Sequence, residues 1–413
     1  MSSGTVHIIG AGLSGLSAAV ALVAKGVRVQ MFEATAFAGG RCRSYHDPAL
    51  GQEIDNGNHL ILSGNWAVHE YLRAIGAEGN ILGPSQPELF FADARTGARW
   101  TIRPNEGAFP WWIFSKSRRV PHTHASDYLA LRRLIRPGAN ITRENGPLWE
   151  RLLHPFLLAA LNTEPEIASP ELIATLMRET LAKGGRFYRP RIASPTLGAA
   201  FIDPAIAFIK AKGGTLRFGV RLRGVTFDAG KVAALDFGGE PLAVRGNDRI
   251  ILAVPPQIAK TLLPGLKVPD EFRAIVSGHF KIAPPPNAAP ITGIIGGAVE
   301  WVFAFPDRIS VTVSNADRLL DVNREDLAAL FWREVARLFG LAPTLPPWQI
   351  VKERRATFAA TQAQEAKRPG AKTQWTNLFL AGDWTATGLP ATIEGAVCSG
   401  RRAAELALTQ TLV

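Results

Sequence analysis

Cysteine is scarce in this chain of 413 residues, and the two that it has, Cys42 and Cys398, exclude a disulfide framework. The sequence contains no CxxC and no HExxH motif, and its eight histidines are scattered, so it predicts no metal site. The low cysteine content favours a reducing cytoplasm as the compartment of the protein.

A basic N-terminal region of the signal-peptide kind is also missing. Residues 5–24 carry no Lys, Arg, Asp or Glu, and this run is long enough to resemble a membrane span. However, no Lys or Arg precedes it, and three glycines interrupt it. We therefore expect a buried strand, a tight turn and a helix, with neither a transmembrane segment nor a secretion signal.

The overall composition is that of a folded protein with an excess of positive charge. Hydrophobic residues make up 47% and charged residues 20%, and the length favours two subdomains over a single core. The net charge of +11 suggests an anionic partner, which could be a nucleic acid, an anionic membrane surface or an acidic ligand.

A glycine-rich turn near the N-terminus predicts a dinucleotide site. The apolar residues 6–9 predict a strand, Gly10-Ala11-Gly12-Leu13-Ser14-Gly15 follows, and residues 16–25 have helical spacing. Gly10 permits the sharp turn, Gly12 lets a pyrophosphate approach the backbone, and Gly15 lets helix and strand pack closely. The free N–H groups where the helix begins, around Leu13 and Ser14, would bind the phosphates.

Glu33 supports this interpretation, because it ends the second predicted strand, residues 27–32. An acid in that position accepts hydrogen bonds from the ribose of adenosine. A double glycine and an arginine follow at Gly39, Gly40 and Arg41, and they would bring backbone and a guanidinium beside a diphosphate. The GxGxxG motif alone does not distinguish NAD from FAD, and a GGR sequence alone is only a turn with a surface charge.

The C-terminal region has a second set of candidate residues. Residues 377–381 predict a buried strand that ends in Gly382 and Asp383, and a helix is expected from about Thr392 to residue 408. At the carboxyl end of a strand, Asp383 would bind a polyol such as a ribityl chain, unless it is a simple loop or N-cap residue. The N–H groups at Thr392 and Ile393 would face the flavin pyrimidine, whereas Glu394 is expected only to complement the helix dipole.

These motifs together resemble the FAD-dependent amine oxidase and phytoene desaturase superfamily. The segments 382–385 with 390–395, and 158–163 with 165–169, are similar more narrowly to the hydroxysqualene dehydroxylase family, also called squalene-associated FAD-dependent desaturases. Asn58 stands where we expect Gln in that family, and Cys398 where we expect a basic residue. The resemblance implies FAD as the cofactor and an α/β fold, with a discontinuous FAD-binding Rossmann-like domain of the GR2 type and an inserted α+β substrate domain.

The resemblance also implies domain boundaries. The FAD-binding domain would comprise residues 1–75, 196–265 and 374–413, and the substrate domain residues 76–195 and 266–373. A helix over 201–212 and short strands over 215–218, 222–227, 232–237 and 249–254 are expected in the middle of the chain. Leu222 matches the position whose backbone faces adenine in the superfamily. No second GxGxxG occurs, so no separate nicotinamide domain is expected.

The positive charge is concentrated in residues 116–191, where thirteen Lys and Arg stand against seven Asp and Glu. The aromatic stretch 108–114 precedes Lys116, Arg118 and Arg119. Aromatics beside cations suit the headgroup level of an anionic membrane, although a buried Trp pair with a solvated charge run behind it is the alternative. Nucleic acid is not expected, because the aromatics do not interleave with the cations.

Three functions are compatible with these patterns. The resemblance implies an enzyme of squalene and hopanoid biosynthesis that takes a long-chain isoprenoid and uses reduced FAD to convert hydroxysqualene to squalene. Its electron donor is external and undetermined, its catalytic residues are unknown, and His59 is the candidate acid, with a structural histidine as the alternative. A carotenoid-type (phytoene) desaturase or an amine oxidase is the second function, and a non-redox prenyl-lipid-binding protein is the third.

Overall fold

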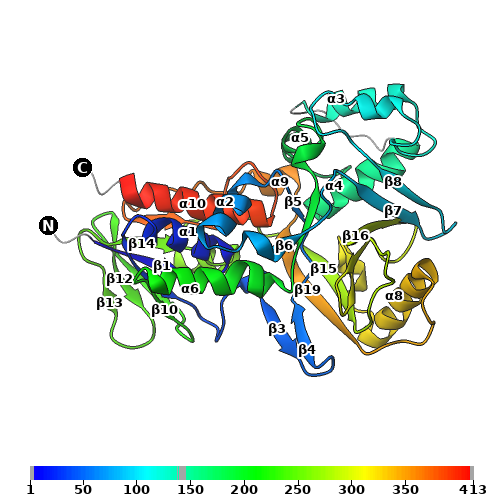
Figure 1. Ribbon diagram of the computed structural model, residues 1–413. Helices are drawn as coiled ribbons and strands as arrows, with labels where there is room; N and C mark the ends of the chain where they lie inside the picture. The colour runs from blue at the N-terminus through cyan, green and yellow to red at the C-terminus, as the bar shows by residue number, and fades with distance from the viewer. Residues whose placement is uncertain (1–3, 137, 139–145, 410–413) are drawn as a thin grey trace.

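The computed structural model describes residues 4–136, 138 and 146–409 (Figure 1). Its first sheet has five parallel strands. All neighbouring strands in this sheet run parallel, as the sequence predicts. The sheet order is β10 (Thr215–Arg217), β2 (Arg28–Phe32), β1 (Thr5–Ile9), β14 (Arg249–Leu252) and β20 (Leu378–Leu380). Three segments that are far apart in the sequence therefore build one α/β unit.

Helices cover this sheet and bring the two ends of the chain together (Figure 1). Helix α1 (Leu13–Val23) packs against α10 (Ile393–Thr409) and α6 (Asp203–Ala211), and α2 (Trp66–Ala74) packs against α10. The contact of α1 with α10 is close because Gly400 has no side chain. A Cβ at that position would lie 2.1 Å from the carbonyl oxygen of Ser14.

A seven-stranded sheet forms the second large unit, and only its β16–β7 pair is parallel. Its order is β19 (Trp348–Phe358), β15 (Phe272–Phe280), β18 (Ile309–Val313), β17 (Trp301–Ala304), β16 (Ile291–Ile295), β7 (Leu89–Asp93) and β8 (Arg99–Ile102). Helix α8 (Arg324–Phe339) packs on one face through apolar side chains such as Phe331 and Trp332. The other face is turned toward the first sheet.

Smaller elements connect these units. The remaining strands are β3 (Ser44–Asp47), β4 (Gln52–Asp55), β5 (Ile61–Leu62), β6 (Ile81–Leu82), β9 (Pro190–Ala193), β11 (Gly224–Asp228), β12 (Lys231–Asp236) and β13 (Leu242–Ala243). The remaining α-helices are α3 (Leu131–Leu134), α4 (His154–Leu161), α5 (Pro170–Glu179), α7 (Pro256–Leu262) and α9 (Gln362–Glu365). Short turns of other helix types include η1 (Gly40–Cys42), η2 (Glu78–Asn80), η3 (Trp111–Phe114), η4 (Ala125–Ala130), η5 (Trp149–Leu153), η6 (Gly185–Phe187), η7 (Gly198–Ile202) and η8 (Ala316–Leu319).

The structure corrects one predicted strand. Strand β11 begins at Gly224, so Leu222 precedes it and lies in a loop. The reason is that the chain turns at Gly219, whose φ is +70°, and then bonds to the end of β2 through Val220 N–H and Glu33 C=O at 2.9 Å. The predicted helix over 201–212 is confirmed as α6, which follows the π-helical turn η7.

The apparent membrane span is part of the first sheet and its covering helix. Residues 5–24 form β1, the glycine turn and α1, and most of them are buried. Within the described part of the chain, no helix has both the length and the apolar character that a membrane crossing requires. Residues 139–145 of the basic segment lie outside the described residues.

Candidate active site

A large cavity of about 1570 Å³ lies between the two sheets. Its walls include the glycine turn after β1, the end of β2, the start of α10, and one face of the seven-stranded sheet. All the nucleotide-site residues predicted from the sequence, except Gly15, line it: Gly10, Gly12, Leu13, Ser14, Glu33, Gly40, Arg41, Leu222, Gly382, Asp383, Thr392 and Ile393. The tertiary structure therefore brings the N-terminal and C-terminal motifs to the same cavity.

The glycine turn leaves room for a ligand at one position and packs tightly at another. Gly10 has a φ of +104°, in the left-handed region that favours glycine. A Cβ on Gly15 would lie 2.1 Å from the carbonyl oxygen of Gly10, so this glycine serves close packing. A Cβ on Gly12 would meet no described atom within 4 Å, and Gly12 begins α1 without a side-chain cap. The open helix start therefore offers N–H groups to an anion.

Glu33 lies beside this turn at the end of β2. Its carboxylate accepts hydrogen bonds from Ala11 N–H at 2.8 Å, and from the N–H and hydroxyl of Thr35, both at 2.9 Å. These bonds hold the carboxylate at the cavity wall, where Leu222 also lies. A carboxylate at the end of the second strand of such a unit can accept hydrogen bonds from an adenosine ribose.

Arg41 and Asp383 form an ion pair inside the cavity. The Nη2 atom of Arg41 donates to Oδ1 of Asp383 at 2.6 Å, and Nη1 donates to the carbonyl oxygen of Ala356 at 2.6 Å. Asp383 is 5% exposed. The sequence predicts a role for each residue toward a cofactor, but it gives no sign that they bind each other.

The start of α10 is organised by two side chains with different functions. Thr392 Oγ1 accepts from Gly395 N–H at 3.1 Å, which satisfies one free donor at the start of the helix. Glu394 instead accepts from Ala67 N–H at 3.0 Å and Val68 N–H at 2.9 Å, at the start of α2. The expectation that Glu394 serves only the dipole of its own helix is therefore incomplete, because the side chain reaches across to a neighbouring helix.

His59 also lines the cavity, close to Arg41 and Asp383. Burial, followed by the positive charge of Arg41, lowers the pKa of His59 to about 4. The imidazole is therefore neutral at pH 7. In that form His59 can orient a partner by hydrogen bonding, but it carries no imidazolium proton to donate.

The structure adds a polar surface that sequence analysis missed. Ser277 of β15 faces Thr312 of β18 across the strand pair, and Asn58 Nδ2 donates to Thr312 Oγ1 at 3.1 Å. All three residues line the cavity. The alternation of polar and apolar residues in β18 could have indicated one polar face, but not that this face meets Asn58.

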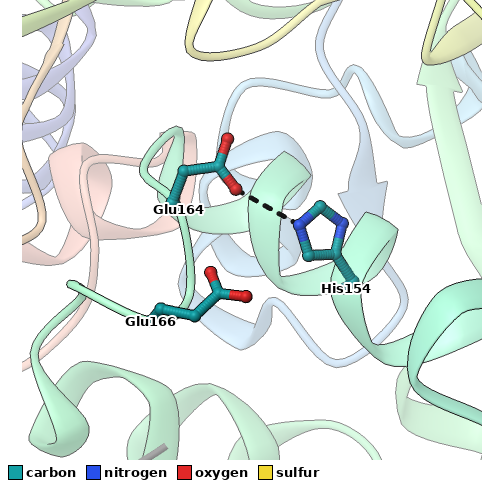
Figure 2. Close-up of side chains that lie close together, drawn as sticks. All are labelled: His154, Glu164 and Glu166. Carbon is teal, nitrogen blue, oxygen red and sulfur yellow. Dashed lines mark hydrogen bonds and ion pairs between the residues drawn. The ribbon is translucent and has the colours of Figure 1, made fainter. Parts of the chain in front are cut away.

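A separate cluster joins His154, the first residue of α4, to Glu164 and Glu166 in the loop that follows this helix (Figure 2). His154 Nε2 lies 3.2 Å from Glu164 Oε2, and one atom from each of His154, Glu164 and Glu166 lies within 4.8 Å of the others. The hydrogen bond to Glu164 raises the pKa of His154, and the same bond lowers the pKa of Glu164. These shifts fit an ion pair that fastens the 162–166 loop to α4.

The parallel sheet, the uncapped glycine turn and the placement of Glu33 define the class of protein as a dinucleotide-binding α/β oxidoreductase. The family described as flavin-containing amine oxidoreductase matches residues 13–408. The chain belongs to this family, and a flavin is its cofactor. The predicted α/β fold and the choice of FAD are confirmed.

The curated relatives narrow the assignment. Hydroxysqualene dehydroxylase from Rhodopseudomonas palustris is 53% identical over 412 residues, covering 98% of this chain and 99% of that protein. Hydroxysqualene dehydroxylase from Sinorhizobium fredii is 52% identical over 411 residues, with the same coverage of both chains. Among solved structures, cyclohexylamine oxidase from Brevibacterium oxydans matches with a TM-score of 0.72 and 17% identity, covering 99% of this chain and 100% of that one. The resemblance to the hydroxysqualene dehydroxylase family is confirmed.

The residues of the cavity fit FAD. Open space beside Gly12, the uncapped start of α1 and the fixed carboxylate of Glu33 provide the parts of a dinucleotide site. The cavity volume of about 1570 Å³ exceeds the range of about 300–1,000 Å³ that is usual for ligand pockets, so a cofactor and a second molecule can share it.

Proposed function

We propose that this protein removes the hydroxyl group of hydroxysqualene reductively and so produces squalene. The single observation that carries the proposal is the identity of 53% over almost the full length to a curated hydroxysqualene dehydroxylase. The match spans 98% of this chain, so it extends over the segments that line the cavity as well as those that carry the cofactor motifs.

The reaction balances as one bond broken and one formed. The C–O bond of the allylic alcohol breaks, a C–H bond forms at the same carbon, and a proton converts the departing hydroxide to water. Bound at the glycine turn and the Arg41–Asp383 pair, reduced FAD would supply the hydride, and an external donor would have to restore its electrons after each turnover. The chain's own contribution is to hold the alcohol carbon near the cofactor site and to exclude water from the allylic cation.

The walls of the cavity suit an isoprenoid chain. Away from the glycine turn they include Phe156, Leu176, Phe187, Trp301 and Phe303. These side chains offer apolar contact along the length of a hydrocarbon and few polar groups that would retain water. The same walls support our proposal that residues 76–195 and 266–373 constitute the substrate domain.

We propose that the predicted FAD contacts operate as the motifs suggest. Gly10, Gly12, Leu13 and Ser14 would hold the pyrophosphate at the start of α1, and Gly15 would let the helix pack closely against the turn. The residues that would bind the remaining parts of FAD are Glu33, Gly40, Arg41, Leu222, Gly382, Asp383, Thr392 and Ile393. Their position around one cavity supports this assignment.

The alternative functions receive less support. An amine oxidase generally requires an aromatic cage at the flavin, but Trp384 is 2% exposed and its indole N–H donates to Val254 C=O at 3.0 Å. Trp384 lines the cavity, but its indole N–H is bonded to the backbone, and one tryptophan does not make a cage. A non-redox lipid binder would have no need for Glu33, Arg41 and Asp383 in an ordered arrangement around the nucleotide end.

We also propose that the protein contacts an anionic membrane on its cytoplasmic face, where it would collect its lipid substrate. Phe109, Trp111 and Phe114 form an aromatic patch on the surface. Their exposed fractions are 72%, 48% and 65%, respectively. The guanidinium of Arg118 lies 4.6 Å from the centre of the Trp111 ring. Trp112, in contrast, is buried against Tyr128, so the two tryptophans have different environments.

The aromatic patch is connected to the wall of the cavity. Asn105 Nδ2 donates to Phe109 C=O at 3.0 Å, and Asn105 C=O accepts from Gly185 N–H at 2.9 Å. Gly185 begins η6, whose last residue, Phe187, lines the cavity. The patch that would enter the headgroup layer is therefore joined through Asn105 to a segment that lines the cavity, which supports lipid uptake at this point.

The function is tested by anaerobic turnover. The purified protein should be yellow, and its chemically reduced form should convert hydroxysqualene to squalene, detected by mass spectrometry. Phytoene and a primary amine serve as the competing substrates. A colourless protein that binds prenyl lipids, or one that turns over phytoene or the amine but leaves hydroxysqualene intact, would contradict the proposal.

A further inference from the structure

A small polar cluster, Ser277, Thr312 and Asn58, lies on the cavity wall that the seven-stranded sheet forms, where Trp301 of β17 is paired with Thr312. Ser277 and Thr312 are directly paired across β15 and β18, and directly opposed residues have neighbouring side chains. Asn58 joins them by donating from Nδ2 to Thr312 Oγ1 at 3.1 Å and to Val311 C=O at 3.2 Å. A Cβ on Gly57 would lie 3.7 Å from Ser277 Oγ, so Ser277 also adjoins the loop that carries Asn58.

Two polar atoms of this cluster have no hydrogen-bond partner among the described residues. They are the hydroxyl oxygen of Ser277, a residue that is 1% exposed, and the carbonyl oxygen Oδ1 of Asn58. A buried polar group without a partner costs free energy, so its retention requires an explanation. Both residues line the cavity, which means that a ligand in the cavity can supply the missing partner.

The orientation of the Asn58 amide is fixed by its neighbours. The carbonyl oxygen of Val311 can only accept a hydrogen bond, so the NH₂ group of Asn58 must face it. The Oδ1 atom is therefore left as an acceptor. The Ser277 hydroxyl can donate or accept, and the pair together offers one acceptor and one donor to a ligand.

We infer that Ser277 and Asn58 bind the hydroxyl group of an isoprenoid alcohol and thereby select the alcohol over the hydrocarbon. This inference rests on the proposed function, whose substrate carries one hydroxyl on a long apolar chain. The substrate O–H donates to Asn58 Oδ1, and its oxygen accepts from the Ser277 O–H. One alcohol group satisfies both unpaired atoms.

The same contacts act during the reaction. As the C–O bond lengthens, negative charge develops on the departing oxygen, and the hydrogen bond from Ser277 becomes stronger. Squalene lacks the oxygen, so after reaction the two polar atoms lose their partner. The product therefore binds less tightly than the substrate, which favours its release.

The test compares variants of the FAD-loaded protein. Ser277→Ala should lower kcat/KM for hydroxysqualene about tenfold, the usual worth of one hydrogen bond of this kind. Its thermal stability should remain equal or rise, since the removed hydroxyl has no partner among the described residues. Ser277→Thr, which keeps a hydroxyl, should restore most of the activity.

A second variant and a matched control separate recognition from folding. Asn58→Leu also removes the two hydrogen bonds that Nδ2 donates, so a change in stability would not be specific. The readout is therefore the ratio of the affinities for hydroxysqualene and squalene, each measured from the change in the flavin spectrum. That ratio should fall about tenfold. Ser310→Ala is the control, because Ser310 is a fully buried serine of β18 that bonds to His279 at 2.8 Å. The Ser310→Ala variant should lose thermal stability but keep the wild-type ratio of hydroxysqualene to squalene affinity.

The outcomes are distinguishable from a failure of the proposed function. If the wild-type protein does not convert hydroxysqualene, the proposed function fails. If the wild type converts it while Ser277→Ala and Asn58→Leu keep the wild-type affinity ratio, only this inference fails. A loss of stability in Ser277→Ala, or an equal loss of affinity for squalene, would also overturn it, since either result indicates a purely structural role.

Discussion

Arg41 and Asp383 are 342 positions apart in the sequence, and their side chains are joined by a hydrogen bond of 2.6 Å. The pair connects the double-glycine motif after β2 with the motif at the end of β20. Asp383 is nearly inaccessible, whereas the Arg41 side chain is 42% exposed. We interpret the pair as a preorganised part of the cofactor site, in which each residue holds the other in place before FAD binds.

Asp383→Ala should weaken FAD binding about 10- to 100-fold, because it removes a charged hydrogen-bonding group and releases Arg41. Asp383→Asn keeps the shape and one acceptor, so it should have a smaller effect. The flavin retained after gel filtration, and titration of the apoprotein with FAD, measure the difference. Equal retention in all three proteins would show that Asp383 has no role in the site.

Gly12→Ala and Gly15→Ala should separate cofactor binding from folding. A Cβ on Gly12 enters open space, so the apoprotein should keep its stability but lose FAD affinity, since the methyl group would occupy the cofactor's approach. A Cβ on Gly15 would lie 2.1 Å from Gly10 C=O, so this variant should lose roughly 1–3 kcal/mol of folding free energy. Thermal unfolding of the two apoproteins, together with FAD titration, tests the contrast; tight FAD binding by Gly12→Ala would contradict it.

His59→Gln should leave the shape of the pH profile unchanged between about pH 5.5 and 8. The pKa of His59 is lowered to about 4 by burial and Arg41, so the residue stays neutral throughout that range. The measurement is kcat/KM for hydroxysqualene against pH in both proteins. A decline with rising pH that is present in the wild type and absent in the variant would show that the His59 imidazolium is the proton donor.

Glu300 should make the folded state less stable as pH rises. Burial raises its pKa from 4.5 to about 7, so between these values the folded protein holds a proton that the unfolded chain has lost. The free energy of unfolding should therefore fall with increasing pH over this window, by up to about 3 kcal/mol at pH 7 and above. Glu300→Gln should remove this pH dependence. Denaturant unfolding of both proteins from about pH 4 to 8 gives the free energy of unfolding at each pH. If the two plots of unfolding free energy against pH run parallel, the prediction is wrong.

Replacing Phe109 and Phe114 by Ser should reduce binding to liposomes that contain anionic lipid, because both side chains are exposed in the aromatic patch. Removal of Lys116, Arg118 and Arg119 should reduce binding further and weaken its salt dependence. Flotation with neutral and anionic liposomes measures both effects. Binding that is insensitive to anionic lipid and survives both sets of changes would argue against a membrane surface.

The sequence was sufficient for the parts of the site that are built from neighbouring residues. The strand, the glycine turn and the helix of residues 5–24 follow from an apolar run, the glycine spacing and a helical period. The position of Glu33 follows from the length of a strand–helix–strand unit. Each of these patterns is local, so the backbone conformation that it requires can be inferred without knowing the rest of the fold.

Tertiary structure alone decided which distant side chains meet. The Arg41–Asp383 pair, the reach of Glu394 to the start of α2, and the junction of Asn58 with Ser277 and Thr312 all join separate segments. The junction of Asn58 with Ser277 and Thr312 depends on the register of β15 with β18, whereas the other two contacts depend on how the parallel sheet and its helices bring distant segments together. A sequence period determines which face of a strand a residue occupies, but the residue opposite is set by long-range pairing, because a shift of one position would turn every side chain to the other face.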